Sequence, residues 1–462
     1  MKNTFKKITA LTLSILTVAS LASCNKDKPE DISDSQESNS SAENSETAEK
    51  KTLTLAVLSG DSSLNDSIRW FNNSNDDFEI ELINYGMKVS KSEDSYYDDA
   101  LTMLKMDLVS GNTPDIVSLP SDSMYVLVNG GYLADLYPLM ESGGDISKDD
   151  FLPNVLEGLE YKDKLPVICS DFYIMTAVAK TSNVGADSEN WSLNEVVEFY
   201  NNLPSDTDLL YKIWEWESLM SGNTLETFIM RKIVRDCVDY ENAECSFGST
   251  FIDAVNFLQG KDFLKSNLVQ DPEKDISAQA WSLINDKAFV NCTHISGMDA
   301  YLSQETSSVF GGEDITFVGY PSESGCGAIV RTGTMYGILG DSDSKQEAWE
   351  FIASQLKSSE NIPVLTERLE KQAASQKTDS FALRKPQQLP YPENNTEITI
   401  SDETVQKTVD YIMSVEFDPY YDTQVENIIR EEYTSVLSGE KTIDECIEIL
   451  ESRISIYLSE RS

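Results

Sequence analysis

Hydrophobic and polar positions alternate along the chain in a pattern that predicts strands separated by helices. Leucine and valine recur at every second position over residues 52–58, which predicts a strand, and residues 78–83 predict another. Between them, Ile68, Trp70 and Phe71 belong to a segment with helical spacing. A strand, a helix and a strand in this order form a βαβ unit, so we expect a parallel sheet.

Further elements follow the same alternation. Residues 97–109 predict a helix, residues 110–114 contain the glycine and proline that end it, and residues 115–118 predict a short strand. Later in the chain, Ser192 is expected to cap a helix, with Glu195 completing a capping box. The body of the chain therefore has the composition of strands and helices typical of an α/β protein.

The N-terminus has the layout of an export signal. Lys2, Lys6 and Lys7 form a basic head, residues 8–19 are apolar or small, and the run closes on Leu-Ala-Ser-Cys at Cys24. This closing run resembles the bacterial lipobox, in which the preceding segment is removed and the cysteine carries lipid. The alternative is an uncleaved helical anchor, but the apolar run is shorter than the roughly 18 to 20 residues that span hydrocarbon.

We therefore expect residues 1–23 to be a lipoprotein signal peptide and residues 24–51 to be a lipidated tether. The segment after Cys24 is rich in Ser, Glu and Asp and nearly free of large apolar side chains. Such a segment buries too little surface to offset its ordering entropy, which predicts disorder; a long polar helix is the alternative. The folded body should begin near Thr52.

Composition bounds the size of the body and its partners. The chain has 462 residues, of which 40% are hydrophobic, and this is enough for two lobes with separate cores. Its 79 acidic residues outnumber 36 basic ones, and the formal net charge is -43. Such a surface repels phosphate backbones, so we expect no nucleic-acid partner. No later segment is apolar and long enough to predict a membrane span.

Cysteine and histidine usage argues against a metal site or a hydrolase. The cysteines after Cys24 lack the close paired spacing of zinc or redox motifs; they are Cys169, Cys237, Cys245, Cys292, Cys326 and Cys446. Cys237 and Cys245 are the one local pair that could be bridged, and free thiols are expected elsewhere. His294 is the only histidine, so a histidine-based triad would depend on it alone. We expect no metal and no other cofactor.

Several motifs follow one another in a recognisable order. Residues 104–117 contain a helix, a glycine, a Pro-Asp pair and an apolar strand, and residues 130–136 read G-G-Y-L-A-D-L. Further matching segments are residues 161–166, 191–196, 238–258, 287–290, 318–321 and 345–356. As a set they resemble extracellular solute-binding proteins of family 1, the maltose-binding-protein-like sugar receptors of ABC importers. Asp163 and Asp286 stand where that family usually has glycine.

The resemblance implies a type II periplasmic-binding-protein-like fold, in which two α/β lobes close on a ligand. Each lobe would be a mixed sheet flanked by helices, joined by hinge crossovers near Tyr173, near Gly319 and past Leu356. We expect an N-terminal lobe and a C-terminal lobe, which comprise residues 52–172 plus 320–356 and residues 173–319 plus 357–462, respectively.

The resemblance also implies a ligand cleft beyond the strand ends, as is usual for open α/β sheets. Sugar sites combine aromatic faces with carboxylates and amides that bind hydroxyl groups. The expected cleft residues are Gly60, Asp61, Ser62, Pro120, Asp122, Asp171, Tyr173, Ser296, Gly297 and Thr334. Asp61 and Asp122 each precede a predicted helix, so either could instead be a helix N-cap.

Tryptophans are candidates for stacking on a sugar ring. Trp214 and Trp216 lie where the resemblance implies an aromatic floor for the ligand, and Trp281 is a further candidate. On a helix Trp214 and Trp216 would point about 200° apart, so at most one of them would face the ligand. Trp70 and Trp349 lie in predicted helices, and we expect both to pack in the core.

These observations predict a monomeric, lipid-anchored receptor on the outer face of the bacterial cell membrane. It would capture a mono- or oligosaccharide and deliver it to the permease subunits of an ABC importer, without being an enzyme. The same fold binding a non-sugar solute, or presenting a ligand to a sensor, is the alternative. An extracytoplasmic glycosidase that uses paired carboxylates is a third possibility. The sequence names neither the sugar nor the permease.

The anchor can be tested at Cys24. Cys24→Ser should release the protein from the membrane fraction, or leave it as unprocessed precursor, because the acylated sulfur is gone. Cell fractionation with and without detergent measures this, with Cys245→Ser as a control. A Cys24→Ser protein that is still processed and still requires detergent would contradict the lipid anchor.

Overall fold

The computed structural model describes most of the chain from Lys50 onward. The described residues are 50–60, 62–89, 96–142, 146–211, 224–261, 282–298, 310, 312–357, 361–376, 380–382, 397–399 and 401–460. They belong to one compact unit, Lys50–Ser462. Outside the described residues lie the predicted signal peptide and the predicted tether up to residue 49, which includes Cys24, and also Asp61, Trp214, Trp216 and Trp281. Lys51, the last residue of the predicted tether, belongs to the first strand instead.

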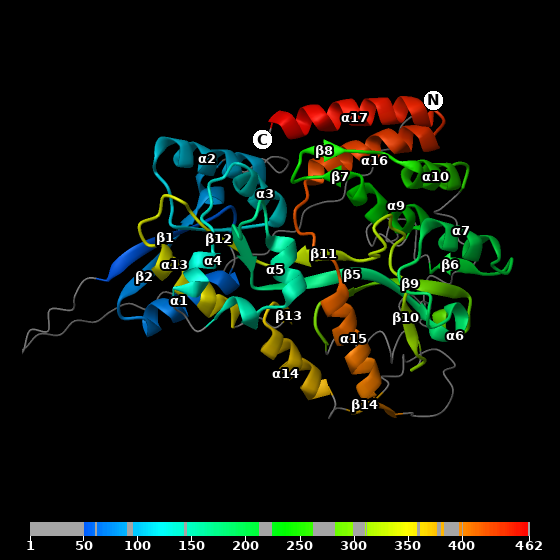
Figure 1. Cartoon of the computed structure of the whole chain (residues 1–462), viewed down its shortest axis with the longest axis horizontal. Coiled ribbons are helices and arrows are strands. Elements are labelled where there is room, and N and C mark those ends of the chain that lie inside the picture. Colours follow the sequence, from blue (N-terminus) through cyan, green and yellow to red (C-terminus); the bar gives the residue numbers. More distant parts are fainter. Residues whose placement is uncertain are drawn as a thin grey trace, which may run out of the picture. The chain divides into compact units, whose positions relative to one another are not determined.

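The first of two larger sheets is mixed and has the strand order β2-β1-β3-β12-β4 (Figure 1). β1 (Lys51–Val57) pairs in parallel with β2 (Phe78–Asn84) and β3 (Ile116–Leu119). The predicted βαβ unit is thereby confirmed. β12 (Met335–Ile338) pairs antiparallel with β3 and with β4 (Val167–Cys169). A segment more than 160 residues beyond β4 thus completes this sheet.

Helices α1 (Ser62–Ser74) and α13 (Lys345–Leu356) pack against this sheet and against each other. Ile68 and Phe71 of α1 are buried, and Trp349 of α13 is 1% exposed, as predicted for the core. Trp70 is 68% exposed, so its predicted place in the core is wrong. Each helical residue turns about 100°, which puts Trp70 on the face opposite Ile68 while Phe71 returns to the buried face.

The second larger sheet is built on one long strand, β5 (Asp171–Lys180). β9 (Ala288–Ile295), β10 (Ile315–Phe317), β11 (Ile329–Thr332) and β13 (Ile362–Pro363) all pair antiparallel with β5. On the far side of β9, β6 (Asp208–Leu210) pairs in parallel. This sheet is therefore mixed, as predicted for both lobes.

The other elements are helices and short strands that lie outside the two larger sheets. Ser192 and Glu195 make the predicted capping box: the Ser192 backbone N–H donates to the Glu195 carboxylate at 2.7 Å. In chain order, the helices before residue 237 are η1 (Tyr85–Lys88), α2 (Tyr96–Ser110), α3 (Ser121–Asn129), α4 (Tyr137–Glu141), η2 (Lys148–Asp150), α5 (Pro153–Leu159), α6 (Thr181–Val184), α7 (Leu193–Asn201) and α9 (Leu225–Asp236). The helices and strands that follow are β7 (Val238–Asp239), β8 (Glu244–Cys245), α10 (Ser249–Leu258), α14 (Thr366–Gln376), β14 (Ser380–Ala382), β15 (Glu397–Thr399), α15 (Asp402–Ser414), α16 (Thr423–Leu437) and α17 (Ile443–Glu460).

The chain passes between the two sheets at three places. Ser170 alone separates β4 from β5, and the chain returns to the first sheet between Thr332 and Met335. This return lies further along than the crossover predicted near Gly319, because β11 pairs with β5 before β12 joins the first sheet. After α13 the chain enters the second sheet again at β13. The lobe limits themselves stay a prediction.

Within the described residues the cysteines are free thiols, so Cys237 and Cys245 are not bridged. No group of three or more His, Cys, Asp or Glu side chains in the described part could hold a metal ion. The described helices include none with the length and apolar character required to cross a membrane.

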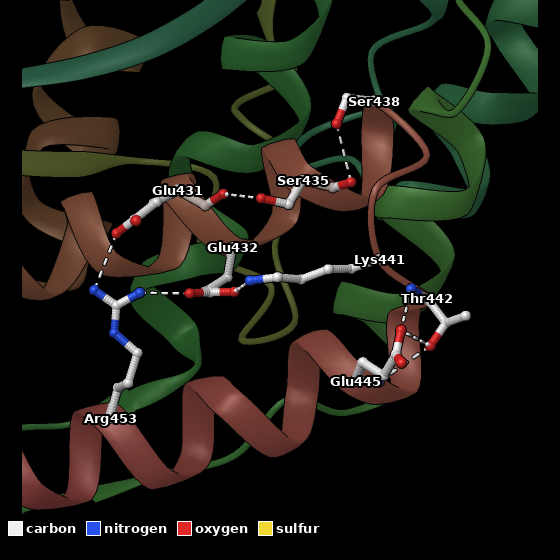
Figure 2. A network of polar contacts seen from close by, with 8 residues as sticks. All are labelled: Glu431, Glu432, Ser435, Ser438, Lys441, Thr442, Glu445 and Arg453. Carbon is white, nitrogen blue, oxygen red and sulfur yellow. Dashed lines mark hydrogen bonds and ion pairs between the residues drawn. The ribbon is translucent and has the colours of Figure 1, made fainter.

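One buried carboxylate joins the last two helices. Figure 2 shows Glu432 of α16 between Lys441 and Arg453, and its side chain is 4% exposed. Arg453 of α17 also donates to Glu431, at 3.0 Å. Burial by itself raises the pKa of Glu432, but the hydrogen bonds from Lys441 and Arg453 outweigh it, so the pKa falls below its ordinary value of 4.5. This carboxylate stabilises the α16–α17 pair when it is ionised.

Glu432→Gln should lower the free energy of unfolding by about 1 to 2 kcal/mol, because two charge-assisted hydrogen bonds are lost while both cations keep access to water. Glu431→Gln is the matched control, since Glu431 is 65% exposed and pairs with the same Arg453. Chemical denaturation at neutral pH measures both variants. Equal stability of the two variants would contradict the role given to Glu432.

The same contact predicts a pH dependence. Since the pKa of Glu432 is lowered by folding, its contribution is fully present above pH 4.5 and is lost as the pH falls through the folded-state pKa. The stability difference between wild type and Glu432→Gln should therefore shrink below pH 4.5. Denaturation curves at pH values on both sides of this limit measure it, and a difference independent of pH would argue against ionisation of Glu432.

Candidate ligand-binding site

Two of the chain passages run side by side at the junction of the sheets. The Ser170 N–H donates to the Thr334 carbonyl at 3.1 Å, and the Gly333 N–H donates to the Asp171 carbonyl at 2.8 Å. A Cβ atom on Gly333 would lie 2.1 Å from the Asp171 carboxylate. Glycine at this position therefore lets the two passages approach closely.

The third passage is held at the same point. The Ile362 N–H donates to the Ser296 carbonyl at 2.9 Å, and the Asn361 side chain donates to the Asp171 carboxylate at 3.1 Å. The Ser170 hydroxyl donates to the same carboxylate at 2.9 Å. Asp171 thus ties together segments from all three passages.

The N-terminus of α3 approaches the junction from the first sheet. The hydroxyls of Ser121 and Thr332 are 2.6 Å apart and share a hydrogen bond. Pro120 occupies the N-cap position of α3, so the N-cap alternative for Asp122 is wrong. Asp122 lies one residue inside the helix, where its carboxylate accepts from the Ser123 N–H at 2.7 Å. The start of α3, which holds the predicted cleft residues Pro120 and Asp122, is thereby linked to β11.

Beside the junction, the second sheet and two helices line a partly open cavity of about 140 Å³. Its charged side chains come from α9, β11 and α16, and Met175 of β5 contributes to its wall. In the sheet register, Arg331 stands opposite Tyr173, which the sequence predicted for the cleft. The lining residues are Met175, Glu226, Thr227, Met230, Arg231, Val234, Arg235, Arg331, Glu426, Arg430 and Tyr433.

Tyr421 lies between two of the cavity arginines. The guanidinium carbons of Arg235 and Arg331 are 4.5 and 4.2 Å from the centre of its ring, which gives a cation–π contact with each. Burial lowers the pKa of Arg331, and the charge of Arg235 lowers it further. The pKa of Tyr421 is raised by burial, and the Asp122 charge adds to the rise, so Asp122 acts on this ring from the first sheet's side.

The two carboxylates of the cavity already have partners. Glu426 forms an ion pair with Arg235 at 2.8 Å, and Glu226 accepts a hydrogen bond from the Tyr433 hydroxyl. Arg231 lies over the Tyr320 ring at 5.5 Å and points its Nη1 at the Met175 sulfur, 3.9 Å away. The lining therefore holds four arginines and two glutamates, which leaves a formal excess of positive charge. Its chemistry suits a ligand with acceptor oxygens.

The structure places the predicted site residues in three groups. Those at or beside the junction are Pro120, Asp122, Asp171, Tyr173, Ser296, Gly297 and Thr334. Gly60 and Ser62 follow the carboxyl end of β1, which pairs in parallel with β3 at the sheet edge that leads to Pro120, but they form none of the junction contacts described above. Asp61, Trp214, Trp216 and Trp281 lie outside the described residues. A ligand-binding role for each of these residues stays a prediction.

The sequence reasoning missed the cavity arginines and Tyr421. A local signal existed: Arg231 and Arg235 are four residues apart on α9, as are Glu426 and Arg430 on α16, so each pair shares one helix face. In a chain with 36 basic and 79 acidic residues, such arginine spacing stands out. The spacing does not show that α9, α16 and β11 pack together, so it could not predict the cavity.

Comparisons with known proteins bear on the fold. No family model matches the chain, and no curated protein matches it in sequence. Among solved structures, the sugar-binding protein MalE from Xanthomonas citri is 13% identical with a TM-score of 0.54, over 89% of this chain and 98% of that one. The chain has the fold of two-lobed extracellular solute-binding proteins.

Two further structures agree with this fold. A periplasmic oligogalacturonide binding protein from Yersinia enterocolitica is 13% identical with a TM-score of 0.52, over 89% of this chain and 99% of that one. An extracellular solute-binding protein of family 1 from Alicyclobacillus acidocaldarius is 13% identical with a TM-score of 0.51, over 88% and 98% of the two chains. The predicted fold class is thus confirmed.

Proposed function

We propose that this protein is an extracytoplasmic receptor that captures a carbohydrate between its two lobes and delivers it to an ABC importer. The observation that carries the proposal is the junction itself, where Asp122, Tyr173 and Tyr421 come together beside a polar cavity. Aromatic faces cover the C–H side of a pyranose, and carboxylates accept from its hydroxyls. Similar folds carry the names of sugar-binding and oligogalacturonide-binding proteins.

The proposed mechanism is closure of the lobes about the three chain passages. A ligand shifts an open and a closed state only through contacts that it makes better in the closed one. Asp122 would supply such contacts from the first sheet's side, and Tyr173 and Tyr421 from the second. Hinges of few residues, such as Ser170 between β4 and β5, suit rotation of lobes that keep their own sheets intact. Binding and release complete the cycle, so the proposal includes no chemical step.

The N-terminal segment completes the proposal. Cys24 would carry the lipid and residues 24–51 would hold the body away from the outer face of the cell membrane, where it acts as a monomer. Trp214, Trp216 or Trp281 would add a stacking surface within the second lobe. The permease subunits of the importer would then receive the ligand from the closed receptor.

The proposal predicts ligand-dependent stability and compaction. For the chain from residue 24 with Cys24→Ser, a cognate sugar at 100 times its dissociation constant should add about 2.7 kcal/mol to the free energy of unfolding. A thermal-shift screen against mono- and oligosaccharides measures this, and small-angle scattering should then show a smaller radius of gyration with the sugar bound.

Variants tie this effect to the junction. Tyr173→Ala and Tyr421→Ala should each weaken binding about 5- to 150-fold, because an aromatic contact to the sugar is lost. Tyr97→Ala is the control, since Tyr97 is an exposed side chain of α2. A tightly bound sugar that leaves the scattering unchanged, and that binds both variants like wild type, would refute the closure at this site.

A further inference from the structure

The side chains that line the cavity have a positive formal charge, whereas the whole chain has a negative one. The whole protein carries a formal -43, yet four arginines and two glutamates line this one cavity. Arg235 is buried and Arg331 is half-buried, so their charges are poorly screened by solvent. Grouping like charges in a half-buried space is costly, and proteins do so where an anion offsets the cost.

The contacts within the protein leave a hydrogen-bond donor of the cavity arginines without an acceptor among the described residues. The Glu426 carboxylate pairs with Arg235, and Glu226 accepts from Tyr433, so the described contacts of both glutamates are with other residues than Arg331. The Nη1 atom of Arg331 is buried and has no hydrogen-bond partner among the described residues. Its guanidinium carbon lies 4.2 Å from the centre of the Tyr421 ring, and this cation–π contact gives Nη1 no acceptor oxygen. A buried donor without an acceptor costs free energy that a ligand oxygen would recover.

The cavity also has a suitable size and place. One water needs at least about 10 to 15 Å³ of cavity space, so a cavity of about 140 Å³ has room for a carboxylate, sulfate or phosphate group. Arg331 stands opposite Tyr173 on one face of the sheet, and Tyr173 lies two residues after Asp171 of the junction, on the same face. An anionic group in the cavity would therefore belong to a ligand whose remainder lies at the junction.

We propose that the ligand is an anionic carbohydrate whose acidic group is bound by the arginines of this cavity, with Arg331 as the principal contact. A guanidinium group can donate two parallel hydrogen bonds to two oxygens of one carboxylate, sulfate or phosphate group. A neutral sugar hydroxyl has one oxygen and no charge, so it binds the same guanidinium more weakly. This inference rests on the proposed carbohydrate receptor and narrows its ligand. The acidic outer surface does not oppose it, because exposed charges are screened beyond about 8 Å at physiological ionic strength.

Matched sugar pairs test the inference by calorimetric titration of the chain from residue 24 with Cys24→Ser. The pairs are galactose with galacturonate, glucose with glucuronate, and trisaccharides of each, with glucose 6-phosphate and glucose 6-sulfate as alternative sources of the charge. Citrate and inorganic phosphate serve as anions without a sugar. At least one acidic sugar should bind at least about tenfold more tightly than its neutral partner and than either simple anion.

Variants then locate the acidic group. Arg331→Gln and Arg430→Gln should weaken the acidic sugar about 10- to 100-fold and leave any binding of the neutral partner within about threefold. Arg331→Lys keeps the charge and should recover only part of the loss, since lysine lacks the paired donors. Arg69→Gln is the matched control, because Arg69 is an arginine of α1 that is 72% exposed and pairs with Asp66. Thermal unfolding of each variant checks that it is folded.

The outcomes separate this inference from the proposed function. If a neutral sugar binds as tightly as its acidic partner, and Arg331→Gln affects both alike, the anionic-ligand inference is wrong while the carbohydrate receptor stands. If citrate binds as tightly as an acidic sugar, the cavity binds anions, but the proposal of a carbohydrate receptor is wrong. Binding of none of these compounds would overturn both.

Discussion

The structure depends on the pairing of β5 with strands from four other parts of the chain. β5 begins one residue after β4, the edge strand of the first sheet, and then runs the length of the second sheet. Its first residues pair with β11 and β13, and its later residues pair with β9 and β10. Each of these strands continues into the first sheet or into a helix. The register of β5 therefore fixes the three places where the chain runs between the two sheets.

This register also explains why the site lies where it does. β11 places Arg331 opposite Tyr173, and the next residues, Thr332 and Gly333, contact α3 and Asp171. The turn from β11 to β12 needs a glycine because Asp171 fills the space of a side chain. The same short segment therefore forms part of the sheet, the junction and the cavity wall. A change of one residue in register would turn Arg331 to the other face of the sheet.

A second contact joins the helices of the first sheet to the other half of the body. The rings of Tyr125 and Tyr161 contact Tyr420, in the segment between α15 and α16, and Tyr125 also contacts Tyr240. The Tyr420 hydroxyl donates to the Leu159 carbonyl at 2.7 Å, and the Tyr125 hydroxyl donates to the Tyr240 carbonyl at 2.9 Å. Each aromatic pair contributes about 0.5 to 1.5 kcal/mol beyond its buried area. Any rotation of the lobes has to preserve or replace these contacts, which limits the directions of movement.

The sequence by itself determined the local elements and the class of fold. The alternation over residues 52–83, the capping box at Ser192 and the buried place of Trp349 were predicted correctly, because each depends on spacing within one element. Tertiary structure decided the rest. Trp70 faces solvent because the turn of α1 aims Ile68 and Phe71 at the sheet instead. The arginine cavity exists because α9, β11 and α16, far apart in the chain, pack around β5, and side-chain spacing carries no record of which elements will meet.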